Sequence, residues 1–302
     1  MTTKGWELTI SWRDRIRDFS YGVTLNLYDN TTTIDEYPNP GYSLSNYYNG
    51  RKYGEIWGYT SIGIAKTQEE MDAHLAKADQ SRLGNNWAAG DMMYADLNGD
   101  GIISNGENTL QNHGDLTVIG NSTPRYNYGI ILDAQWKGFD VKLFITGVGK
   151  RDYYPTIAGN GVSEFWGFMN NAKYQANLYE PQLDYFRPAD TDNPLGPNLD
   201  AYFTRPSYQT GTKNKESQTH FLQNAAYCAF KNLTIGYTIP QKITRKAYIE
   251  NVRIFFSAEN LGKITKFTKL GDPEMIEAYN AYNFGKVYPL SRVFSCGLNV
   301  TF

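Results

Sequence analysis

The chain has 302 residues, enough for one large domain or two modest ones. Its formal net charge of −2 indicates neither a basic surface for nucleic acid nor an acidic tail. Aromatic residues reach 15%, with 24 Tyr, and no stretch approaches the roughly 18 apolar residues of a membrane helix. Together with 28 Gly, this composition predicts an all-β protein with many turns and long polar loops.

Seven segments alternate apolar and polar side chains with a period of two, as strands with two different faces do. In the last segment, for example, Phe294, Cys296 and Leu298 share one face, while Ser295 and Gly297 share the other. In chain order, the segments are residues 6–13, 19–27, 126–136, 139–146, 232–239, 252–259 and 294–302.

Alternating strands occur in soluble β-sandwiches as well as in membrane barrels, and the connections distinguish the two. Outer-membrane barrels have short periplasmic turns and long extracellular loops. Here short links, at residues 14–18, 137–138 and 241–250, alternate with very long ones, at about 29–124, 150–224 and 261–291. We therefore predict an antiparallel up-and-down transmembrane β-barrel segment, with one face of each strand toward lipid and the other toward a watery interior.

Seven strands cannot close a bacterial barrel, which has an even number of strands and no lipid-exposed edge. We therefore expect about seven strands of a larger barrel, the last one ending in the periplasm at Phe302. Aromatic residues near the ends of the apolar faces predict an interfacial girdle, and these are Trp6, Trp12, Tyr126, Trp136 and Phe139.

The two cysteines, Cys228 and Cys296, have no CxxC motif and no His partner. Strand alternation places their side chains on opposite faces of the sheet. We therefore predict that they do not form a disulfide with each other.

Residues 96–107 match the calcium-binding loop of EF-hands at every ligand position. Ca²⁺ is a hard ion that takes six to eight oxygen ligands. The side chains at positions 1, 3, 5 and 12 and the backbone carbonyl at position 7 belong to Asp96, Asn98, Asp100, Glu107 and Ile102. No helix pattern flanks the loop, so we predict an EF-like, structural Ca²⁺ site. The alternative is an Asp/Asn/Gly turn whose side chains cap their own backbone.

Catalytic signatures are missing. The sequence has no HExxH and no GxSxG motif, and its three histidines, His74, His113 and His220, are far apart. We predict that the chain is not an enzyme. Two stretches inside the long connections have helical patterns: residues 71–83, after a capping box of Thr67 and Glu70, and residues 163–178.

Seven short stretches carry a family resemblance in the right order and at plausible spacing. They are TKGWELTI (3–10), GDMMYADLNGDGI (90–102), IGNSTPRYNYG (119–129), KGFD (137–140), KNLTIGYTIP (231–240), FSAENL (256–261) and YPLSR (288–292). Together they resemble the C-terminal region of TonB-dependent outer-membrane transporters of the SusC/RagA family. The likeness covers nearly the whole chain and is weakest over residues 156–214.

This resemblance implies that residues 1–302 are the last seven strands of a barrel of about 22 strands, with residues 35–124 as a long extracellular loop. Plug domain, TonB box, signal peptide and earlier strands are then expected elsewhere, and Met1 is expected to start a truncated reading frame. The family imports nutrients, typically oligosaccharides and sometimes peptides, across the Gram-negative outer membrane. A SusD-like surface lipoprotein closes over the extracellular mouth, and TonB supplies energy through the N-terminal part. The alternative from another class is a soluble, secreted, calcium-stabilised β-sandwich that binds carbohydrate.

Aromatic residues also gather in the first two long connections. Because aromatic faces stack on sugar rings, the candidate substrate contacts are Tyr53, Trp57, Tyr59, Tyr153 and Trp166. The alternative is that these rings pack the loops together or against the lipoprotein lid.

Overall fold

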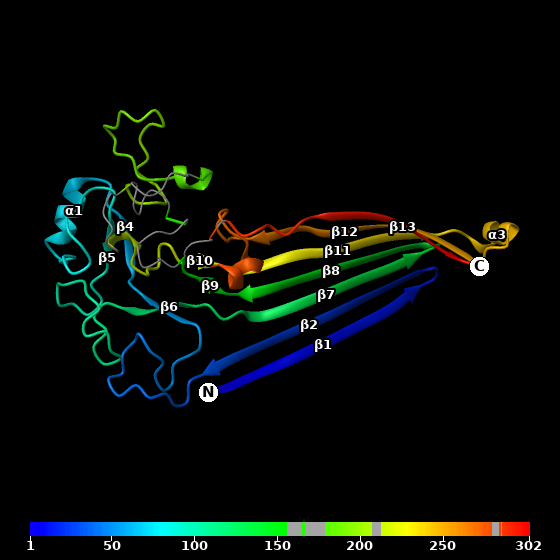
Figure 1. The fold of residues 1–302 in the computed structure, drawn as a ribbon, viewed down its shortest axis with the longest axis horizontal. Coiled ribbons are helices and arrows are strands. Elements are labelled where there is room, and N and C mark those ends of the chain that lie inside the picture. The colour runs from blue at the N-terminus through cyan, green and yellow to red at the C-terminus, as the bar shows by residue number, and fades with distance from the viewer. Residues whose placement is uncertain (156–164, 167–178, 207–212, 280–283, 285) are drawn as a thin grey trace.

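A computed structural model describes residues 1–155, 165–166, 179–206, 213–279, 284 and 286–302. Within these ranges, the main feature is a seven-stranded antiparallel sheet whose strands follow one another in chain order. Figure 1 shows the strands running from a loop-rich end to a narrow end that holds the C-terminus. The strands are β1 (Thr2–Ile16), β2 (Phe19–Thr33), β7 (Arg125–Trp136), β8 (Phe139–Lys150), β11 (Tyr227–Thr238), β12 (Asn251–Thr265) and β13 (Val293–Thr301).

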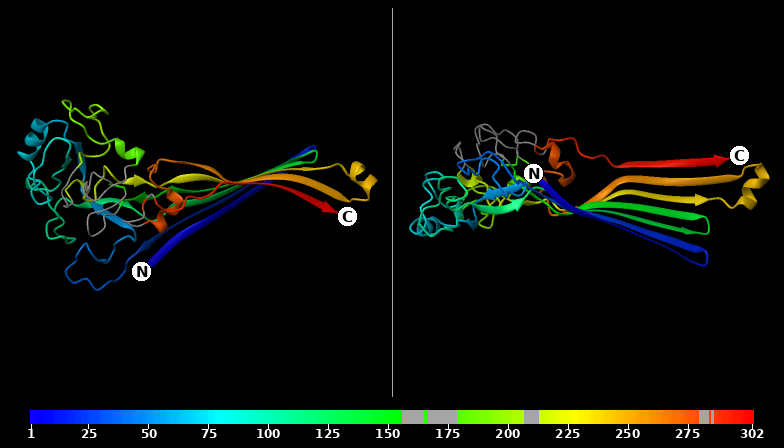
Figure 2. Two further views of the ribbon diagram at one scale, coloured as in Figure 1. Left: turned by 45° about the horizontal axis from the view of Figure 1, so that its top comes forward. Right: turned by 90° about the horizontal axis from the view of Figure 1, so that it is seen from below.

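These strands confirm the seven segments that the alternation predicts, and their order confirms the up-and-down arrangement. All short connections lie at the narrow end and all long ones at the loop-rich end (Figures 1 and 2). The longest of the short connections contains α3 (Gln241–Thr244) and the 3₁₀ turn η3 (Arg245–Ala247). The sheet is open, with β1 and β13 at its edges, as expected for part of a larger barrel.

One face of the sheet is apolar. The register aligns one row of side chains across all seven strands: Trp12, Val23, Leu132, Leu143, Leu233, Ala258 and Phe294. Much of this face is uncovered, and Trp12 is 62% and Phe294 61% exposed. Among the described residues, the other sheets have two strands each and belong to the long connections, so none packs against this face. The soluble sandwich alternative is therefore wrong.

The opposite face is polar, and its charged side chains pair with one another. Arg253 of β12 donates to both oxygens of Asp140 of β8, at 2.9 and 2.5 Å. A Cβ atom at Gly236, which lies between them on β11, would be 2.6 Å from Asp140 Oδ1, so this pair needs glycine there. Arg13 of β1 lies 3.8 Å from Asp133 of β7. A face with this chemistry suits contact with water.

A bulge at Lys231 interrupts β11, where the register against β8 slips by one residue. Side chains before the bulge therefore lie on the other face from the one that simple alternation predicts. As a result, Cys228 shares the apolar face with Cys296, and the prediction of opposite faces is wrong. Both cysteines are free, as predicted, since β12 separates the strands that carry them.

The long connections fold together at the loop-rich end into a body that we call the loop head (described parts of residues 34–124, 151–226 and 266–292). All three connections supply side chains to its hydrophobic core, including Met71, Tyr94, Ile103, Phe165, Trp166, Phe203, Phe221, Phe267 and Phe284. No described helix is long and apolar enough to span a membrane.

Small elements shape the loop head. Three two-stranded sheets pair β3 (Glu55–Gly58) with β6 (Thr117–Asn121), β4 (Ser61–Ile64) with β5 (Met92–Tyr94), and β9 (Asp152–Tyr153) with β10 (Gln223–Asn224). The described helical elements are α1 (Gln68–Leu75) and the 3₁₀ turns η1 (Glu180–Leu183), η2 (Lys213–Lys215) and η4 (Pro273–Ala278).

The capping box correctly predicts the start of α1, because the Thr67 hydroxyl accepts a hydrogen bond from the Glu70 amide at 3.2 Å. The helix ends at Leu75, earlier than the pattern over residues 71–83 predicts. Just beyond it, the Asp79 amide donates to the Gly101 carbonyl at 2.8 Å, so the backbone bonds to another segment. The second predicted helix, over residues 163–178, falls mostly outside the described residues.

Candidate functional site

The predicted calcium loop is a series of tight turns held by its own side chains. The two carboxylate oxygens of Asp96 accept hydrogen bonds from the Gly99 amide at 2.7 Å and the Gly101 amide at 2.9 Å. Asn98 and Asp100 each accept from the amide two residues further on, at 3.0 and 2.7 Å. Gly99 and Gly101 have φ values of 76° and 79°, which glycine adopts without strain.

A buried carboxylate that the sequence pattern does not single out closes this loop. Asp115 is fully buried and accepts hydrogen bonds from the Leu97 amide at 2.7 Å and the Ser104 amide at 2.8 Å. It therefore fastens the two sides of the turn series together. Asp115 lies beyond the twelve-residue pattern, so no spacing rule would have identified it.

The oxygen ligands for calcium are only partly gathered. The side chains of Asp96, Asn98 and Asp100 lie within one short turn series, whereas Glu107 is exposed further along the chain. Among the described residues, no three His, Cys, Asp or Glu side chains come close enough to hold a metal ion. The calcium site, including the Ile102 carbonyl, stays a prediction.

Most of the predicted substrate contacts are not presented to a ligand. Trp166 and Tyr59 are 0% and 3% exposed in the core of the loop head, so the prediction that these two stack on substrate is wrong. Tyr153 is half-buried and stacks on Phe284, with ring centroids 5.7 Å apart. Trp57 is also half-buried. These four rings follow the alternative in which aromatic residues pack the loops together.

Tyr53 differs, because it belongs to an exposed aromatic cluster. Its ring stacks on Tyr47 at a centroid distance of 6.2 Å, and Tyr47 meets Tyr37 edge-on at 5.5 Å. The three rings are 49%, 36% and 40% exposed in that order. The Arg51 guanidinium lies 5.7 Å from the Tyr47 centroid and donates to the Asn46 carbonyl at 2.7 Å, so it helps to hold the loop that carries the cluster. We call Tyr37, Tyr47 and Tyr53 the tyrosine cluster.

A buried ionic group ties the first long connection to the second. Asp91 is 1% exposed and pairs with Arg205 at 2.9 Å and with Lys213 at 2.7 Å. Asn214 donates a further hydrogen bond to it at 2.9 Å. Burial lowers the pKa of Lys213, and its charge is compensated by Asp91. This group has an architectural role in the loop head.

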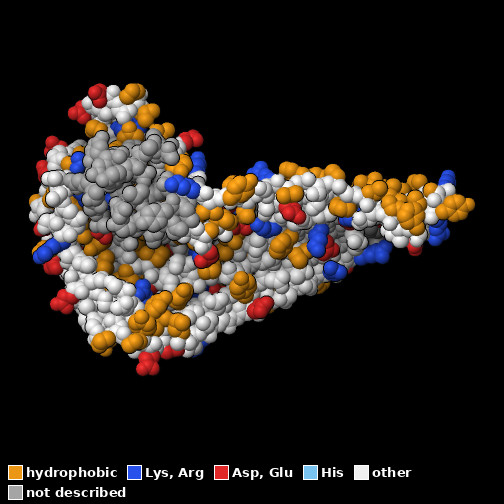
Figure 3. Space-filling view, viewed as in Figure 1, with side chains coloured by type: hydrophobic (Ala, Val, Ile, Leu, Met, Phe, Trp, Pro, Cys, Tyr) orange, Lys and Arg blue, Asp and Glu red, His pale blue; other side chains and the backbone are white. Residues whose placement is uncertain are grey.

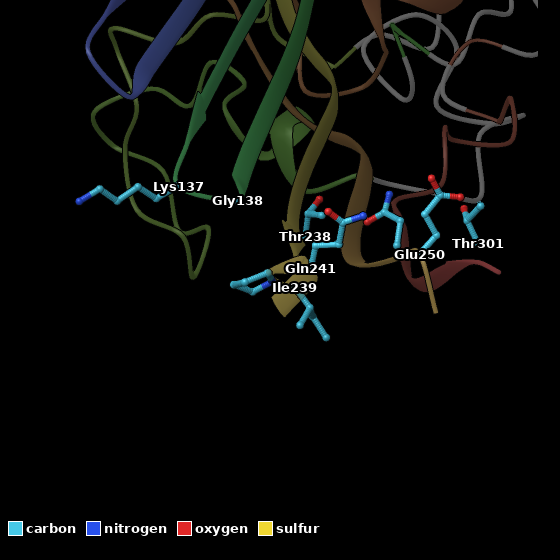
Figure 4. A pocket seen from close by; sticks show the side chains of 9 residues that line it. Lys137, Gly138, Thr238, Ile239, Gln241, Glu250 and Thr301 are labelled. Atoms are coloured by element: carbon cyan, nitrogen blue, oxygen red, sulfur yellow. The ribbon is translucent and has the colours of Figure 1, made fainter. Parts of the chain in front are cut away.

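A hollow of about 560 Å³ opens at the narrow end of the sheet, between the short turns (Figure 4). Its walls include Gly138, Thr238 and Gln241, and one carboxylate, Glu250. The Lys137 side chain extends away from the other labelled side chains (Figure 4). The hollow therefore lacks a converging set of charged or nucleophilic groups.

The amino-acid sequence is similar to known receptors. No family model matches the sequence. TonB-dependent receptors P3 and P26 of Formosa agariphila are each 24% identical to it over 100% of this chain. The chain spans 29% of the length of these curated relatives.

Solved structures share the fold. The RagAB peptide transporter matches 99% of this chain and 29% of its own, with a TM-score of 0.64 and 19% identity. The RagAB peptide importer in its open–open state has a TM-score of 0.61 at 18% identity, covering 99% of this chain and 28% of its own. The predicted resemblance is thereby confirmed: the chain is similar along its whole length to part of a TonB-dependent transporter of the SusC/RagA type.

Proposed function

We propose that this chain forms part of the barrel wall of an outer-membrane, TonB-dependent nutrient importer in a Gram-negative bacterium. The observation that carries the proposal is the single sheet with one exposed apolar face and one paired polar face. Such a sheet is stable where lipid covers the first face and water meets the second. Its open edges would pair with the remaining strands of the barrel, because unpaired backbone is costly in lipid.

The proposed partners follow from this placement. The loop head lies at the end of the sheet that would face outward, where a SusD-like surface lipoprotein would close over the mouth (Figure 1). A compact hydrophobic core holds the loop head together, so that its outer surface could bind such a partner as a folded unit. TonB would act through the part of the protein outside these residues.

The proposed transport is tested with the intact protein in its own cells. The complete reading frame should fractionate with the outer membrane, and its deletion should abolish uptake of a labelled nutrient. Uptake should also stop when TonB is removed, because import across this membrane needs energy from the inner one. Uptake that persists without TonB would contradict the proposal.

For the substrate class we propose oligosaccharides, supported by the tyrosine cluster, whose exposed rings can stack on sugars. Among the predicted contacts Tyr53 is the residue that fits this role. Peptides are the alternative, since RagAB is described as a peptide transporter.

Tyr53→Ala should weaken oligosaccharide binding several-fold in a fluorescence titration of the purified protein. Tyr288→Ala is the matched control, because Tyr288 is 81% exposed but lies in another connection, outside the cluster. Equal losses in the two variants, or binding of peptides alone, would contradict the sugar assignment.

We also propose that residues 96–107 bind Ca²⁺. Asp96, Asn98, Asp100 and the Ile102 carbonyl would supply the first oxygen ligands, and Glu107 would complete the set. The geometry in favour is the close grouping of three oxygen-bearing side chains on a turn that Asp115 already fastens. Bound Ca²⁺ would stiffen the loop head.

Calorimetric titration should give binding in the range of extracellular calcium modules, about 10⁻⁴–10⁻³ M. The double variant Asp96→Asn with Asp100→Asn should abolish the heat. Asp190→Asn with Asp192→Asn removes the same charge from another exposed loop and should change nothing. The absence of both heat and added thermal stability at millimolar Ca²⁺ would overturn the site.

A further inference from the structure

An aromatic row marks the narrow end of the apolar face. The register places Phe19 beside Trp136, Trp136 beside Phe139, and Phe139 beside Tyr237. Phe19, Trp136 and Phe139 are 40%, 51% and 52% exposed, and the rings of Phe139 and Tyr237 are 4.5 Å apart. Aromatic rings favour the level of the lipid headgroups, where one side is apolar and the other wet. This row therefore sets the depth at which the turns leave the membrane.

Cationic side chains lie just beyond this row. The three turn segments at this end, residues 14–18, 137–138 and 239–250, contain six cationic side chains and three carboxylates. The cationic ones, all exposed, are Arg15, Arg17, Lys137, Lys242, Arg245 and Lys246. The carboxylates are Asp14, Asp18 and Glu250. Within the part of the chain that the structure describes, none of the six forms an ion pair. Arg15 lies on β1 two residues after Arg13 and therefore on the polar face. We call the other five the cationic rim.

The connection between β11 and β12 combines charge with exposed apolar groups. Ile243 of α3 is 61% exposed, and Tyr248, just after η3, is 93% exposed. They are interleaved with Lys242, Arg245 and Lys246 on a segment of seven residues, 242–248. Figure 3 shows hydrophobic and cationic side chains side by side at this tip. Segments with this composition lie in a membrane interface, with apolar groups inserted and cations at the phosphates.

Lys137 extends the same chemistry to the turn between β7 and β8. Its ammonium lies 5.4 Å from the centroid of Trp136, a member of the aromatic row. Lys137 lines the hollow together with Glu250, but its side chain extends away from the other labelled side chains (Figure 4). The cation is therefore held beside the aromatic row.

We propose that the cationic rim binds the anionic phospholipid headgroups of the leaflet that meets the narrow end of the sheet. The inference rests on the proposed membrane location and adds to it a lipid preference and the side chains responsible. An anionic leaflet matches the excess of cations, and the exposed Ile243 and Tyr248 need an apolar phase that a soluble anion does not offer.

The test uses the complete protein, with all its barrel strands, purified in detergent, and lipid retention is measured by native mass spectrometry. The probes are phosphatidylglycerol and phosphatidylcholine at equal concentration. The parent protein should retain the anionic lipid preferentially. The triple variant Lys242→Gln, Arg245→Gln, Lys246→Gln should reduce that preference by roughly tenfold to a hundredfold. The control Lys77→Gln, Lys266→Gln, Lys269→Gln removes the same charge from exposed positions in the loop head and should keep it.

Three outcomes would overturn the inference: equal retention of both lipids by the parent, an equal loss in the control, or displacement of the lipid by inorganic phosphate. The last would indicate a site for soluble anions. Failure of the proposed membrane location gives a different result, since the parent would then retain neither lipid. Equal retention of both lipids contradicts the lipid preference of the cationic rim but is compatible with the proposed barrel.

Discussion

The sheet and the loop head use the same residue types in opposite ways. Trp12 on β1 is 62% exposed, whereas Trp166 in the loop head is 0% exposed. The loop head buries its aromatic rings against one another, as soluble proteins do. The sheet turns its apolar side chains outward in register, so it needs an apolar phase from outside. One chain therefore contains a body suited to water and a surface suited to lipid.

We expect the largest loss of stability from a substitution in the core of the loop head. Phe221 is fully buried, and its ring centroid is 4.5 Å from that of Trp166. Phe221→Ala should cost about 3–5 kcal/mol, because it removes apolar contacts and leaves a cavity. Thermal unfolding of the loop head in detergent, followed by protease sensitivity, measures the loss. Leu195→Ala is the control, since Leu195 is 54% exposed in the same body. Equal effects would contradict a packed core there.

The sheet should respond to charge on one face only. Leu143, near the middle of β8, lies on the apolar face, so Leu143→Arg should cost about 2–4 kcal/mol when the barrel is folded into vesicles. Phe144→Arg, one residue further along, places the same charge on the polar face and should cost much less. Folding yield against urea compares the two. An equal loss of folding free energy at both positions would contradict the claim that one face meets lipid and the other meets water.

The stability of the loop head should also depend on pH, because Lys215 is buried in it. Burial lowers the pKa of Lys215 to about 8, against an attraction to Glu216 that raises it. Between pH 8 and the ordinary lysine value of 10.5, the unfolded state binds more protons, so stability rises with pH. Lys215→Met should be more stable than the parent below pH 8, by on the order of 2–3 kcal/mol, and lose this advantage as the pH rises through the window. A difference independent of pH would show that Lys215 is not desolvated.

The two regions also differ in how far the sequence predicts them. A period of two identified every strand of the main sheet, because lipid and water select opposite side chains at alternate positions. The alternation does not predict the bulge at Lys231, because one extra residue leaves no mark in composition. For the same reason it assigns Cys228 to the wrong face of the sheet. Strand alternation is a local signal, and a slip in register is set by the neighbouring strands.

The loop head was predicted poorly because its order comes from contacts between distant segments. Trp166 and Tyr59 are aromatic residues in long loops, and only the assembled core shows that they are buried. Asp91 and Asp115 are ordinary loop carboxylates in the sequence, yet each holds groups from elsewhere in the chain. The capping box of Thr67 succeeded because helix capping depends on neighbours three residues apart.

The most direct test of the central claim compares the two faces of one strand in a membrane. Cysteine replaces Leu143 in one variant and Phe144 in another, with Cys228 and Cys296 changed to alanine in both, and the complete protein is folded into vesicles. A lipid-soluble maleimide should label position 143 and a water-soluble one position 144, because adjacent residues of β8 face opposite phases. Labelling of both positions by the water-soluble reagent would show that the apolar face does not meet lipid and would contradict the account.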